Sequence, residues 1–407
     1  MTTTTPVRQP LDTEKLLSYI YTTVLPHEVS SSSLAPLSQY HLDIHQFSHG
    51  QSNPTYLLTI TQFPTSSTST SISTTSKINS TTIQYVLRKK PSNNVLATAH
   101  AIDREYRIMK ALSLVPNFPV PRMIHYESSS TTLNSSFYLM NYVQGQIFTD
   151  PTLSHIASIR DRQQVYEAMI NTLVKLHNIN PQTIHLQDYG PQVTLDKIST
   201  LGFYSRQIRR LTQVSNEQAK HAPPLPYLEE VMEWFTNQVI ERDKDGIPSS
   251  IIHGDYKLDN LIFSSLSSSS TLQVIAVLDW EMSTLGHPLS DLANMCGVYY
   301  VPVAEPSSNT GFSGLLGANL GWNETGIPTE GELVEIYCKK MNIPYPLQGW
   351  DFYMAFWFFK YATIAQGVAA RANQGIASSA YAKKVGKMAP LLMELCIERI
   401  RSSTKLI

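Results

Sequence analysis

The spacing of hydrophobic and polar positions changes near Gly145. Before this point, short runs rich in β-branched and aromatic residues are bounded by turn residues, a pattern typical of strands. The runs cover residues 42–47, 55–60, 83–88, 123–127 and 137–142. One stretch with helical periodicity, residues 99–114, follows the third run. The pattern therefore predicts a small antiparallel lobe of five strands and one helix.

After Gly145 the apolar residues recur with helical spacing. The expected helices cover residues 163–177, 227–242, 331–341, 350–371 and 380–400. The only strands expected here flank residues 253–260 and precede Asp279. The fold class predicted for the whole chain is α+β, with a small β-rich lobe and a larger, mainly helical lobe.

Ser- and Thr-rich stretches and changes of pattern suggest the domain boundaries. Residues 64–82 are almost entirely Ser and Thr, a composition that cannot build a core, so we expect a disordered loop. Residues 1–36 are expected to form a helical entry segment. Residues 37–145 would then form the β-rich lobe and a hinge, and residues 146–407 the helical lobe.

Charge and composition exclude several classes of protein. The 31 basic and 32 acidic residues nearly cancel, giving a net charge of −1, so no global field favours nucleic acid or an anionic membrane. The longest apolar cluster, residues 352–359, is too short to span a bilayer. The three cysteines lack zinc or disulfide spacing. We expect an intracellular, cytoplasmic protein that acts on small molecules, with a mitochondrial or peroxisomal location as the alternative although no clear signal for either is present. The sequence indicates no oligomeric state.

The spacing of two aspartates and one asparagine predicts phosphoryl transfer. Asp255 follows an apolar run and a His-Gly pair, and Asn260 comes five residues later. Asp279 ends a second apolar run, nineteen residues after Asn260. Protein kinases use an Asp and an Asn at the first spacing to accept the substrate proton and to bind Mg²⁺, and a later Asp holds Mg²⁺ against the nucleotide. We therefore expect Asp255 to be the catalytic base, with Asn260 and Asp279 as Mg²⁺ ligands and ATP as the phosphoryl donor.

Several neighbours of these residues allow two interpretations. Lys257 is either a catalytic cation for the transferring phosphoryl group or a solvent-facing loop lysine. Glu281 either assists the metal through water or caps a turn. His253 is better explained by packing and hydrogen bonding that hold the loop than by acid–base catalysis. Asp291 either caps a helix or anchors the loop backbone.

The β-rich lobe contains candidate nucleotide-binding residues. Small polar residues in the turn of residues 47–53 suit the approach of backbone amides to phosphate. Arg88, at the end of the third strand, is the expected phosphate cation, and Lys89 would replace it if the strand register were shifted by one residue. Glu105 is the expected ion-pair partner, or else a surface charge. The remaining nucleotide-binding candidates are Ser48, Gly50, Ser52 and Asn53 in the turn and Asn141 and Val143 in the hinge.

With these motifs the sequence resembles the aminoglycoside phosphotransferase family, relatives of choline kinases that share the protein-kinase-like fold. Residues 48–56, 86–91, 104–106, 284–291 and 365–368 are similar to the kinase-like domain joined to certain eukaryotic acyl-CoA dehydrogenases. The resemblance implies a Lys or Arg cation on the third strand and ATP-dependent O-phosphorylation of a small molecule. The fused relatives imply a hydroxyacyl-CoA as the acceptor.

Other functions remain open at this stage. The chain could be an inactive kinase-like binding module, or a choline- or aminoglycoside-type kinase. A protein kinase is disfavoured because the sequence has no Asp-Phe-Gly, Ala-Pro-Glu or triple-glycine motif.

Basic residues in the helical lobe predict an anionic substrate. Residues 341–407 contain eight basic and three acidic side chains, and three arginines share one face of a probable helix. The substrate candidates are Arg206, Arg209, Arg210, Lys360 and Arg371. The alternatives are a solvated basic face, or a cation cage made by the aromatic residues of 352–359, which look more like a buried helix.

Overall fold

The computed structural model describes residues 4–5, 10–29, 34–47, 53–63, 81–91, 102–129, 131–190, 202–265, 271–303, 313–375 and 382–404. The chain divides into a smaller unit, Met1–Gln146 with Ile275–Glu281, and a larger unit, Ile147–Val274 with Met282–Ile407.

The segment Ile275–Glu281 belongs to the smaller unit, whereas the sequence predicts it in the helical lobe. Its contacts explain the difference. The backbone amide of Val277 donates to the carbonyl of Pro119 at 2.8 Å. The ring of Trp280 packs against Phe118, with 6.4 Å between their centroids.

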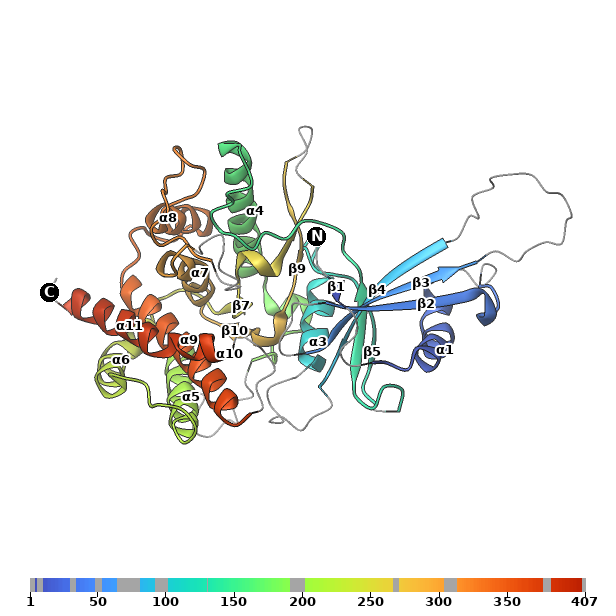
Figure 1. Cartoon of the computed structure of the whole chain (residues 1–407). Coiled ribbons are helices and arrows are strands. Elements are labelled where there is room, and N and C mark those ends of the chain that lie inside the picture. The colour runs from blue at the N-terminus through green and yellow to red at the C-terminus, as the bar shows by residue number, and fades with distance from the viewer. Residues whose placement is uncertain are drawn as a thin grey trace, which may run out of the picture. The chain divides into compact units, whose positions relative to one another are not determined.

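The smaller unit contains an antiparallel sheet of six strands in the order β1-β2-β3-β4-β6-β5 (Figure 1). The five expected strands are present as β2 (Tyr40–Phe47), β3 (Thr55–Gln62), β4 (Thr81–Lys89), β5 (Met123–Glu127) and β6 (Phe137–Asn141). The two-residue strand β1 (Thr4–Thr5) adds an edge pair with β2. Because β4 begins at Thr81, the expected loop of residues 64–82 ends two residues early; residues 64–80 lie outside the described part.

One face of this sheet packs against the N-terminal helices α1 (Thr13–Thr23) and α2 (Leu25–Glu28). Leu16 and Ile20 of α1 share a buried core with Leu42 of β2, Leu58 of β3 and Leu87 of β4. Strand residues alternate between faces, so Arg88 points to the opposite face from Leu87. The helix α3 (Ile102–Leu112), which follows β4, contacts β5 and β6.

The larger unit is mainly helical, as the sequence predicts. Its helices are α4 (Ile159–His177), α5 (Phe203–Gln218), α6 (Leu228–Arg242), α7 (Leu289–Cys296), α8 (Glu330–Met341), α9 (Trp350–Asn373), α10 (Ala382–Gly386) and α11 (Met388–Thr404). The expected single helix of residues 380–400 is thus two helices. Short 3₁₀ turns occur at Leu37–Gln39, Pro181–Ile184, Leu258–Asn260, Trp280–Met282 and Gly297–Tyr300.

Short strands flank the segments that contain Asp255 and Asp279. β7 (Ser250–Ile252) pairs antiparallel with β10 (Thr284–Gly286), a three-residue strand that the sequence pattern does not reveal. β8 (Leu261–Phe263) follows the segment of Asp255, and β9 (Val274–Val277) leads to Asp279. The Ser264 amide donates to the Gln273 carbonyl at 2.8 Å, so a hydrogen bond joins the residue after β8 to the residue before β9.

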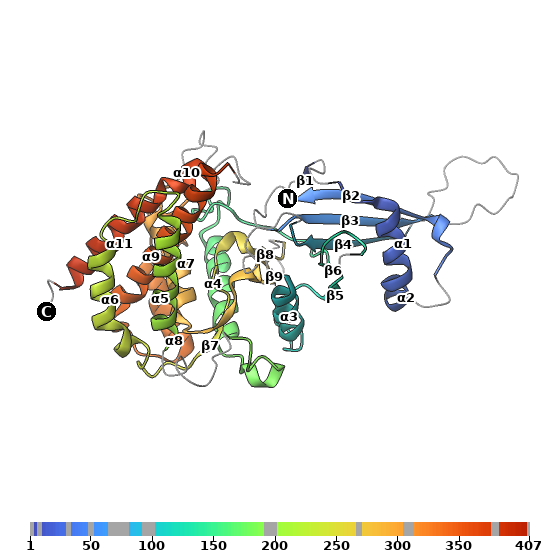
Figure 2. The same ribbon diagram turned by 90° about the horizontal axis from the view of Figure 1, so that it is seen from below.

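The helix α9 forms the centre of the larger unit and contacts α5, α6, α7, α10 and α11; Figure 2 shows α11 running beside it. Its aromatic residues Phe352, Tyr353, Phe356, Trp357 and Phe359 are all buried. They are core residues, so the cation-cage alternative is wrong. Of the helices in the described residues, none has the length and apolar character needed to cross a membrane.

Candidate active site

In the smaller unit the centre of the candidate site is Arg88, near the end of β4. Its register pairs it with Thr55 of β3 and Tyr138 of β6, and only 8% of the residue is exposed. The Arg88 Nε lies 3.0 Å from Oε2 of Glu105 on α3. The expected ion pair is therefore present, and it is buried because the Glu105 side chain is 1% exposed.

The Arg88 guanidinium also binds the segment that follows β9. Its terminal nitrogen lies 2.8 Å from Oδ1 of Asp279 and 3.4 Å from Oε2 of Glu281. Glu281 is thus an ion-pair partner, a role that neither sequence interpretation included. Asp279 has φ +65°, a left-handed conformation uncommon outside glycine and enriched at functional sites.

Hydrogen bonds complete the surroundings of Glu105. The Asn53 amide donates to Oε1 at 3.1 Å, and the Tyr138 hydroxyl donates to Oε2 at 2.9 Å. Burial alone would lower the pKa of Arg88, but Glu105, Asp279 and Glu281 outweigh it and raise that pKa. Arg88 therefore stays charged and holds three carboxylates on one face of the sheet.

Lys89 lies on the other face of the sheet. Two residues before it, Leu87 belongs to the core under α1, and alternation places Lys89 on the same side. Burial lowers the pKa of Lys89. Of the two alternatives, Arg88 is thus the cation that meets Glu105 and Asp279.

In the larger unit, Asp291 of α7 anchors the segment after β7. Its Oδ2 accepts from the His253 amide at 2.6 Å, and its Oδ1 accepts from the Gly254 amide at 2.8 Å. His177 of α4 lies behind it, with Nε2 3.4 Å from Oδ2. Of the two roles considered for Asp291, the structure shows the backbone anchor.

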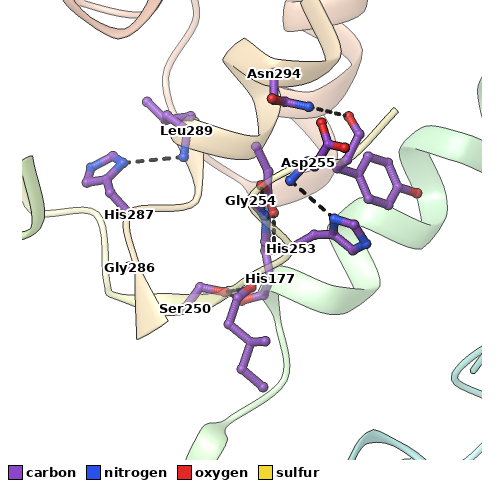
Figure 3. A network of polar contacts seen from close by, with 12 residues as sticks. His177, Ser250, His253, Gly254, Asp255, Gly286, His287, Leu289 and Asn294 are labelled. Carbon is purple, nitrogen blue, oxygen red and sulfur yellow. Dashed lines mark hydrogen bonds and ion pairs between the residues drawn. The ribbon is translucent and has the colours of Figure 1, made fainter. Parts of the chain in front are cut away.

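Two further features shape the turn at residues 253–255 (Figure 3). Gly254 has φ +84°, and a Cβ atom there would lie 2.5 Å from the Met282 carbonyl oxygen, so the position requires glycine. The Nδ1 of His253 accepts from the Asp255 amide at 3.2 Å, and His253 is fully buried. His253 thus holds the loop through packing and hydrogen bonding.

The Asp255 carboxylate is surrounded by donors. Oδ1 accepts from the Tyr361 hydroxyl at 2.6 Å. Oδ2 accepts from the Asn260 amide at 3.1 Å and lies 3.3 Å from the Lys257 ammonium. Burial would raise the pKa of Asp255, but Lys257 and the Tyr361 hydrogen bond outweigh it and lower that pKa. Asp255 is therefore ionised at neutral pH and able to accept a proton.

Asn260 and Asp279 have the chemistry of Mg²⁺ ligands. The Asn260 Nδ2 also donates to the Asp255 carbonyl at 2.9 Å, so Oδ1 is the atom left to act as a ligand. Amide and carboxylate oxygens are donors that Mg²⁺ prefers, usually with phosphate and water completing its shell. Within the described part of the chain, no three His, Cys, Asp or Glu side chains form a metal cluster. Each of the two side chains thus offers, within its own unit, an oxygen donor of the kind that Mg²⁺ prefers.

The structure shows contacts of Tyr361, Asn294 and Lys360 that the sequence pattern does not predict. Lys360 Nζ donates to the Gly254 carbonyl at 2.5 Å, and burial lowers its pKa, so it is part of the loop support rather than of an open basic face. The Tyr361 hydroxyl donates to Oδ1 of Asp255. Asn294 of α7 donates to the Tyr256 carbonyl at 3.0 Å, and Figure 3 shows this second contact. The only available signal was polar residues within apolar helices.

The expected basic patch does not form as one surface. Arg399 pairs with Asp351 at 2.5 Å and Arg401 with Glu230 at 2.9 Å. Arg206, Arg209 and Arg210 lie in the first half of α5, whereas Arg371 lies close to Gly367 and to Gln218 at the far end of that helix. The rise along α5 from Arg206 to Gln218 is about 18 Å. The candidates thus form two separate basic positions.

The remaining nucleotide candidates divide into two groups. Ser48, Gly50 and Ser52 fall outside the described residues. Asn141 ends β6, where its side-chain oxygen accepts from the Arg122 amide, and Val143 follows it, half-buried. The Asn141 side chain is therefore occupied in supporting the sheet.

Comparison with known proteins identifies the family. The model of the phosphotransferase enzyme family matches residues 43–318. The chain is 36% identical to acyl-CoA dehydrogenase family member 10 of Mus musculus, over 87% of this chain and 29% of that protein. It is also 36% identical to acyl-CoA dehydrogenase family member 11 of Homo sapiens, over 88% of this chain and 41% of that protein. The chain thus spans less than half the length of these relatives.

Solved structures agree with this result. A Ralstonia eutropha protein, provisionally identified as an aminoglycoside phosphotransferase, has 30% identity and a TM-score of 0.70, covering 97% of this chain and 99% of that one. The GDP complex of an aminoglycoside 2'-phosphotransferase has 13% identity and a TM-score of 0.50, covering 94% and 98%, and supports the fold alone. The two units have the protein-kinase-like α+β fold expected from the sequence. The chain is a member of the phosphotransferase enzyme family.

Proposed function

We propose that this chain is an ATP- and Mg²⁺-dependent phosphotransferase that moves the γ-phosphoryl group to a hydroxyl of a small molecule. The observation that carries the proposal is Asp255: an ionised carboxylate held on a backbone turn that is itself fixed by Asp291. Phosphoryl transfer requires of the protein mainly positioning and charge stabilisation, together with a group that orients the substrate hydroxyl and accepts its proton. A carboxylate in a fixed orientation meets this last requirement.

In the proposed reaction Asp255 accepts the proton of the substrate hydroxyl. Lys257, 3.3 Å from Asp255 Oδ2, provides positive charge beside the base for the transferring phosphoryl group. Arg88 contributes the cation for the nucleotide phosphates, and Glu105 keeps its guanidinium oriented. Mg²⁺, with Asn260 and Asp279 among its ligands, would neutralise phosphate charge when bound.

The proposed acceptor class is an acyl-CoA that carries a hydroxyl group. The curated relatives at 36% identity are acyl-CoA dehydrogenase family members, which supports an acyl-CoA acceptor. The phosphates of CoA are matched by arginine donors, and Arg206 and Arg371 are the candidates in the larger unit. Arg206 lies in the first half of α5, whereas Arg371 of α9 lies near Gln218 at the other end of α5. We therefore expect only one of the two arginines to contact the CoA phosphates.

The first test separates an enzyme from a binding module. Thermal shift with ATP and Mg²⁺, followed by ATP consumption against a panel of hydroxylated metabolites, is expected to show stabilisation and turnover with at least one acceptor. Binding without turnover against the whole panel would support a scaffold, and the lack of both would contradict the proposal. The scaffold alternative is disfavoured because Asp255, Asn260, Asp279 and Arg88 are all present.

The second test addresses the acceptor. Turnover of a 4-hydroxyacyl-CoA, choline and kanamycin should be compared for wild type, Arg206→Glu and Arg371→Glu. We expect preference for the acyl-CoA and a raised KM for it in one of the two variants, with the other variant as the matched control. Preference for choline or kanamycin would favour the choline- or aminoglycoside-type alternative. Indifference of the acyl-CoA to both charge reversals would contradict the CoA-phosphate assignment.

A further inference from the structure

The face of α9 that reaches the turn of Asp255 continues along the helix. Tyr361 contacts Asp255 from this face, with 2.6 Å between its hydroxyl and Oδ1. Residues three and four positions apart on a helix share a face, so Ile364, Val368 and Arg371 follow Tyr361 on it. These four residues form the α9 stripe, which leads from the proposed base to a cation.

Ile364 is the apolar, exposed part of the α9 stripe. It is 36% exposed, whereas Thr363 and Ala365 on either side of it are 1% and 3% exposed. Val368, one turn further on, is half-buried. A single exposed apolar side chain is common on a protein surface. Here its place between a base and a cation gives it a use, because an uncharged part of a ligand can cover it.

Arg371 ends the α9 stripe as a cation. Among the described residues no acidic side chain forms an ion pair with it, and burial lowers the pKa of Arg371 with no carboxylate to oppose the effect. Glu217, beside the last residue of α5, pairs with Lys220 at 2.5 Å instead. A partly desolvated guanidinium without a carboxylate suits an anionic group supplied by a ligand.

The Arg371 side chain extends back along α9 toward the base. A Cβ atom at Gly367 would lie 3.6 Å from a terminal nitrogen of Arg371 and 2.4 Å from Nε2 of Gln218. The guanidinium is therefore beside a residue one turn earlier, as expected for helical side chains that lean toward the N-terminus. Gly367 is about 9 Å along the helix axis from Tyr361. The distance between base and cation is thus that of a short uncharged chain.

We propose that the α9 stripe binds the phosphoryl acceptor, with its hydroxyl at Asp255, an uncharged chain along Ile364 and an anionic group at Arg371. This inference rests on the proposed function and deepens it. It selects Arg371 over Arg206 as the arginine that meets the anion, and Arg206 already interacts with another residue of the chain.

The α9 stripe defines a class of acceptor. The hydroxyl and the anionic group must be joined by an uncharged segment that spans on the order of 10 Å or more. An acyl-CoA with a hydroxyl on its acyl chain meets this condition, because the uncharged pantetheine arm separates the thioester from the phosphates. A long-chain hydroxy acid meets it as well, with its carboxylate as the anion. Choline and kanamycin are cations and do not.

The first measurement requires no turnover. Octanoyl-CoA and dodecanoate, which lack a hydroxyl, are titrated calorimetrically into wild type, Arg371→Glu and Ile364→Asn. For the probe that wild type binds more tightly, which identifies the source of the anion, we expect Arg371→Glu to raise Kd by about 10- to 100-fold, the value of a hydrogen bond to a charged group. Ile364→Asn should raise it by about 3- to 10-fold through lost apolar contact.

Two exposed residues elsewhere provide matched controls. Arg160→Glu reverses an exposed arginine at the start of α4, and Ile240→Asn changes an isoleucine of α6 that is 65% exposed. Both variants should bind the probe as wild type does. A raised Kd in Arg206→Glu together with an unchanged Kd in Arg371→Glu would move the anion to Arg206 and overturn the inference.

Steady-state kinetics give a second readout. With a 4-hydroxyacyl-CoA, Arg371→Glu should raise the KM for the acceptor and leave the KM for ATP unchanged. The pantetheine thioester of the same acid keeps the hydroxyl and the arm but has no phosphate, so its KM should be the same in Arg371→Glu and wild type. Ile364→Asn should raise the KM for both thioesters. If dodecanoate is the tighter probe, 12-hydroxydodecanoate and its methyl ester replace the two thioesters.

The outcomes separate this inference from the proposed function. Equal KM changes for the charged and the uncharged acceptor in Arg371→Glu, or wild-type Kd values in both stripe variants, would overturn the inference and leave phosphotransfer intact. Failure of wild type to bind either probe would also overturn it. Weakened probe binding in both variants of a protein that transfers phosphate to no acceptor would support the α9 stripe and contradict the proposed function.

Discussion

Asp291 Oδ1 accepts the backbone N–H of Gly254 at 2.8 Å, so a side chain of α7 holds the turn that presents Asp255. Oδ2 of the same carboxylate accepts the amide of His253. The orientation of the proposed base therefore depends on a fully buried residue that binds the backbone of the turn. The Asp255 side chain itself is contacted by Tyr361, Asn260 and Lys257.

Asp291→Asn is expected to lower both stability and turnover. In this variant an NH₂ group replaces one of the two carboxylate oxygens, so one backbone N–H of the turn faces a second donor and loses its acceptor. The loss lowers the free energy of unfolding by about 1–3 kcal/mol. Urea unfolding and kcat measurements check this. Asp161→Asn, at an exposed helix start, is the control and should unfold near wild type. Wild-type stability and turnover in Asp291→Asn would contradict the anchoring role.

The pH dependence of that stability difference has a definite sign. Burial would raise the pKa of Asp291, but hydrogen bonds from His177 and the His253 amide outweigh it and lower that pKa. A lowered folded-state pKa contributes stability above the unfolded value, about 3.9 for Asp, and the contribution is lost as the pH falls through the folded-state pKa. The difference in the free energy of unfolding between wild type and Asp291→Asn should thus be largest at neutral pH and should decrease as the pH falls. A gap that grows with acidity would be inconsistent with this assignment.

Gly254→Ala is expected to damage the turn directly. The residue has φ +84°, and the new Cβ would lie 2.5 Å from the Met282 carbonyl. We expect a loss of at least about 1 kcal/mol of stability from the conformation alone and a large fall in kcat. Gly246→Ala is the control: its φ is +85° but no atom lies within 4 Å of a Cβ there. If both variants lost the same activity, backbone conformation rather than the contact with Met282 would explain the effect.

Arg88→Ala should raise the KM for ATP and destabilise the smaller unit. It removes the cation from Glu105, which is 1% exposed, and an unpaired buried charge costs about 3–5 kcal/mol. Arg88→Lys keeps a charge but loses the geometry of the guanidinium, so we expect a milder effect. Lys89→Ala, on the opposite face, is the control in steady-state kinetics. A larger change in the KM for ATP in Lys89→Ala than in Arg88→Ala would show that Lys89, and not Arg88, is the phosphate cation.

Asp279→Asn is expected to weaken Mg²⁺-ATP binding rather than proton acceptance. The amide keeps the size of the side chain but loses the charge that Mg²⁺ and Arg88 both use. Calorimetric titration with ATP in the presence and absence of Mg²⁺ should show that the Mg²⁺-dependent gain in affinity falls. Glu281→Gln, which also contacts Arg88, is the comparison and should retain more of that gain. An undiminished gain in Asp279→Asn would exclude Asp279 as a ligand.

Most of the fold could be predicted because its elements have clear periodicity. The strands β2 to β6 and the helix α3 follow from alternation and helical spacing, and α9 follows from a long run of apolar residues. The strand β10 has three residues, too few to show a period. The attachment of 275–281 to the smaller unit depends on tertiary contacts of Val277 and Trp280 with residues far away in the sequence.

The candidate site was predicted where spacing carries chemical meaning. Asp255, Asn260 and Asp279 lie in recognisable segments. Strand alternation limits the phosphate cation to one of Arg88 and Lys89, and the strand register in the structure decides between them. Spacing could not identify Tyr361, because it lies 106 residues from Asp255 in the sequence. It could not identify Asn294 either, because Asn294 is linked to Asp255 only through the Tyr361 hydroxyl. A single basic patch could not be judged from the sequence, because Arg399 and Arg401 form ion pairs with acidic residues that are distant in the sequence.

The central claim is that Asp255 is the catalytic base, and Asp259 provides a matched control in the same loop. Both carboxylates lie near Lys257, at 3.3 Å and 3.6 Å. Transfer of labelled γ-phosphate from ATP to the best acceptor of the panel should be measured for wild type, Asp255→Asn and Asp259→Asn, with ATP binding measured on the same samples. From the role of Asp255 as the base we expect that Asp255→Asn binds ATP but loses about 10²–10⁴-fold in kcat, whereas Asp259→Asn stays within a few-fold of wild type. Near-wild-type transfer by Asp255→Asn would contradict it.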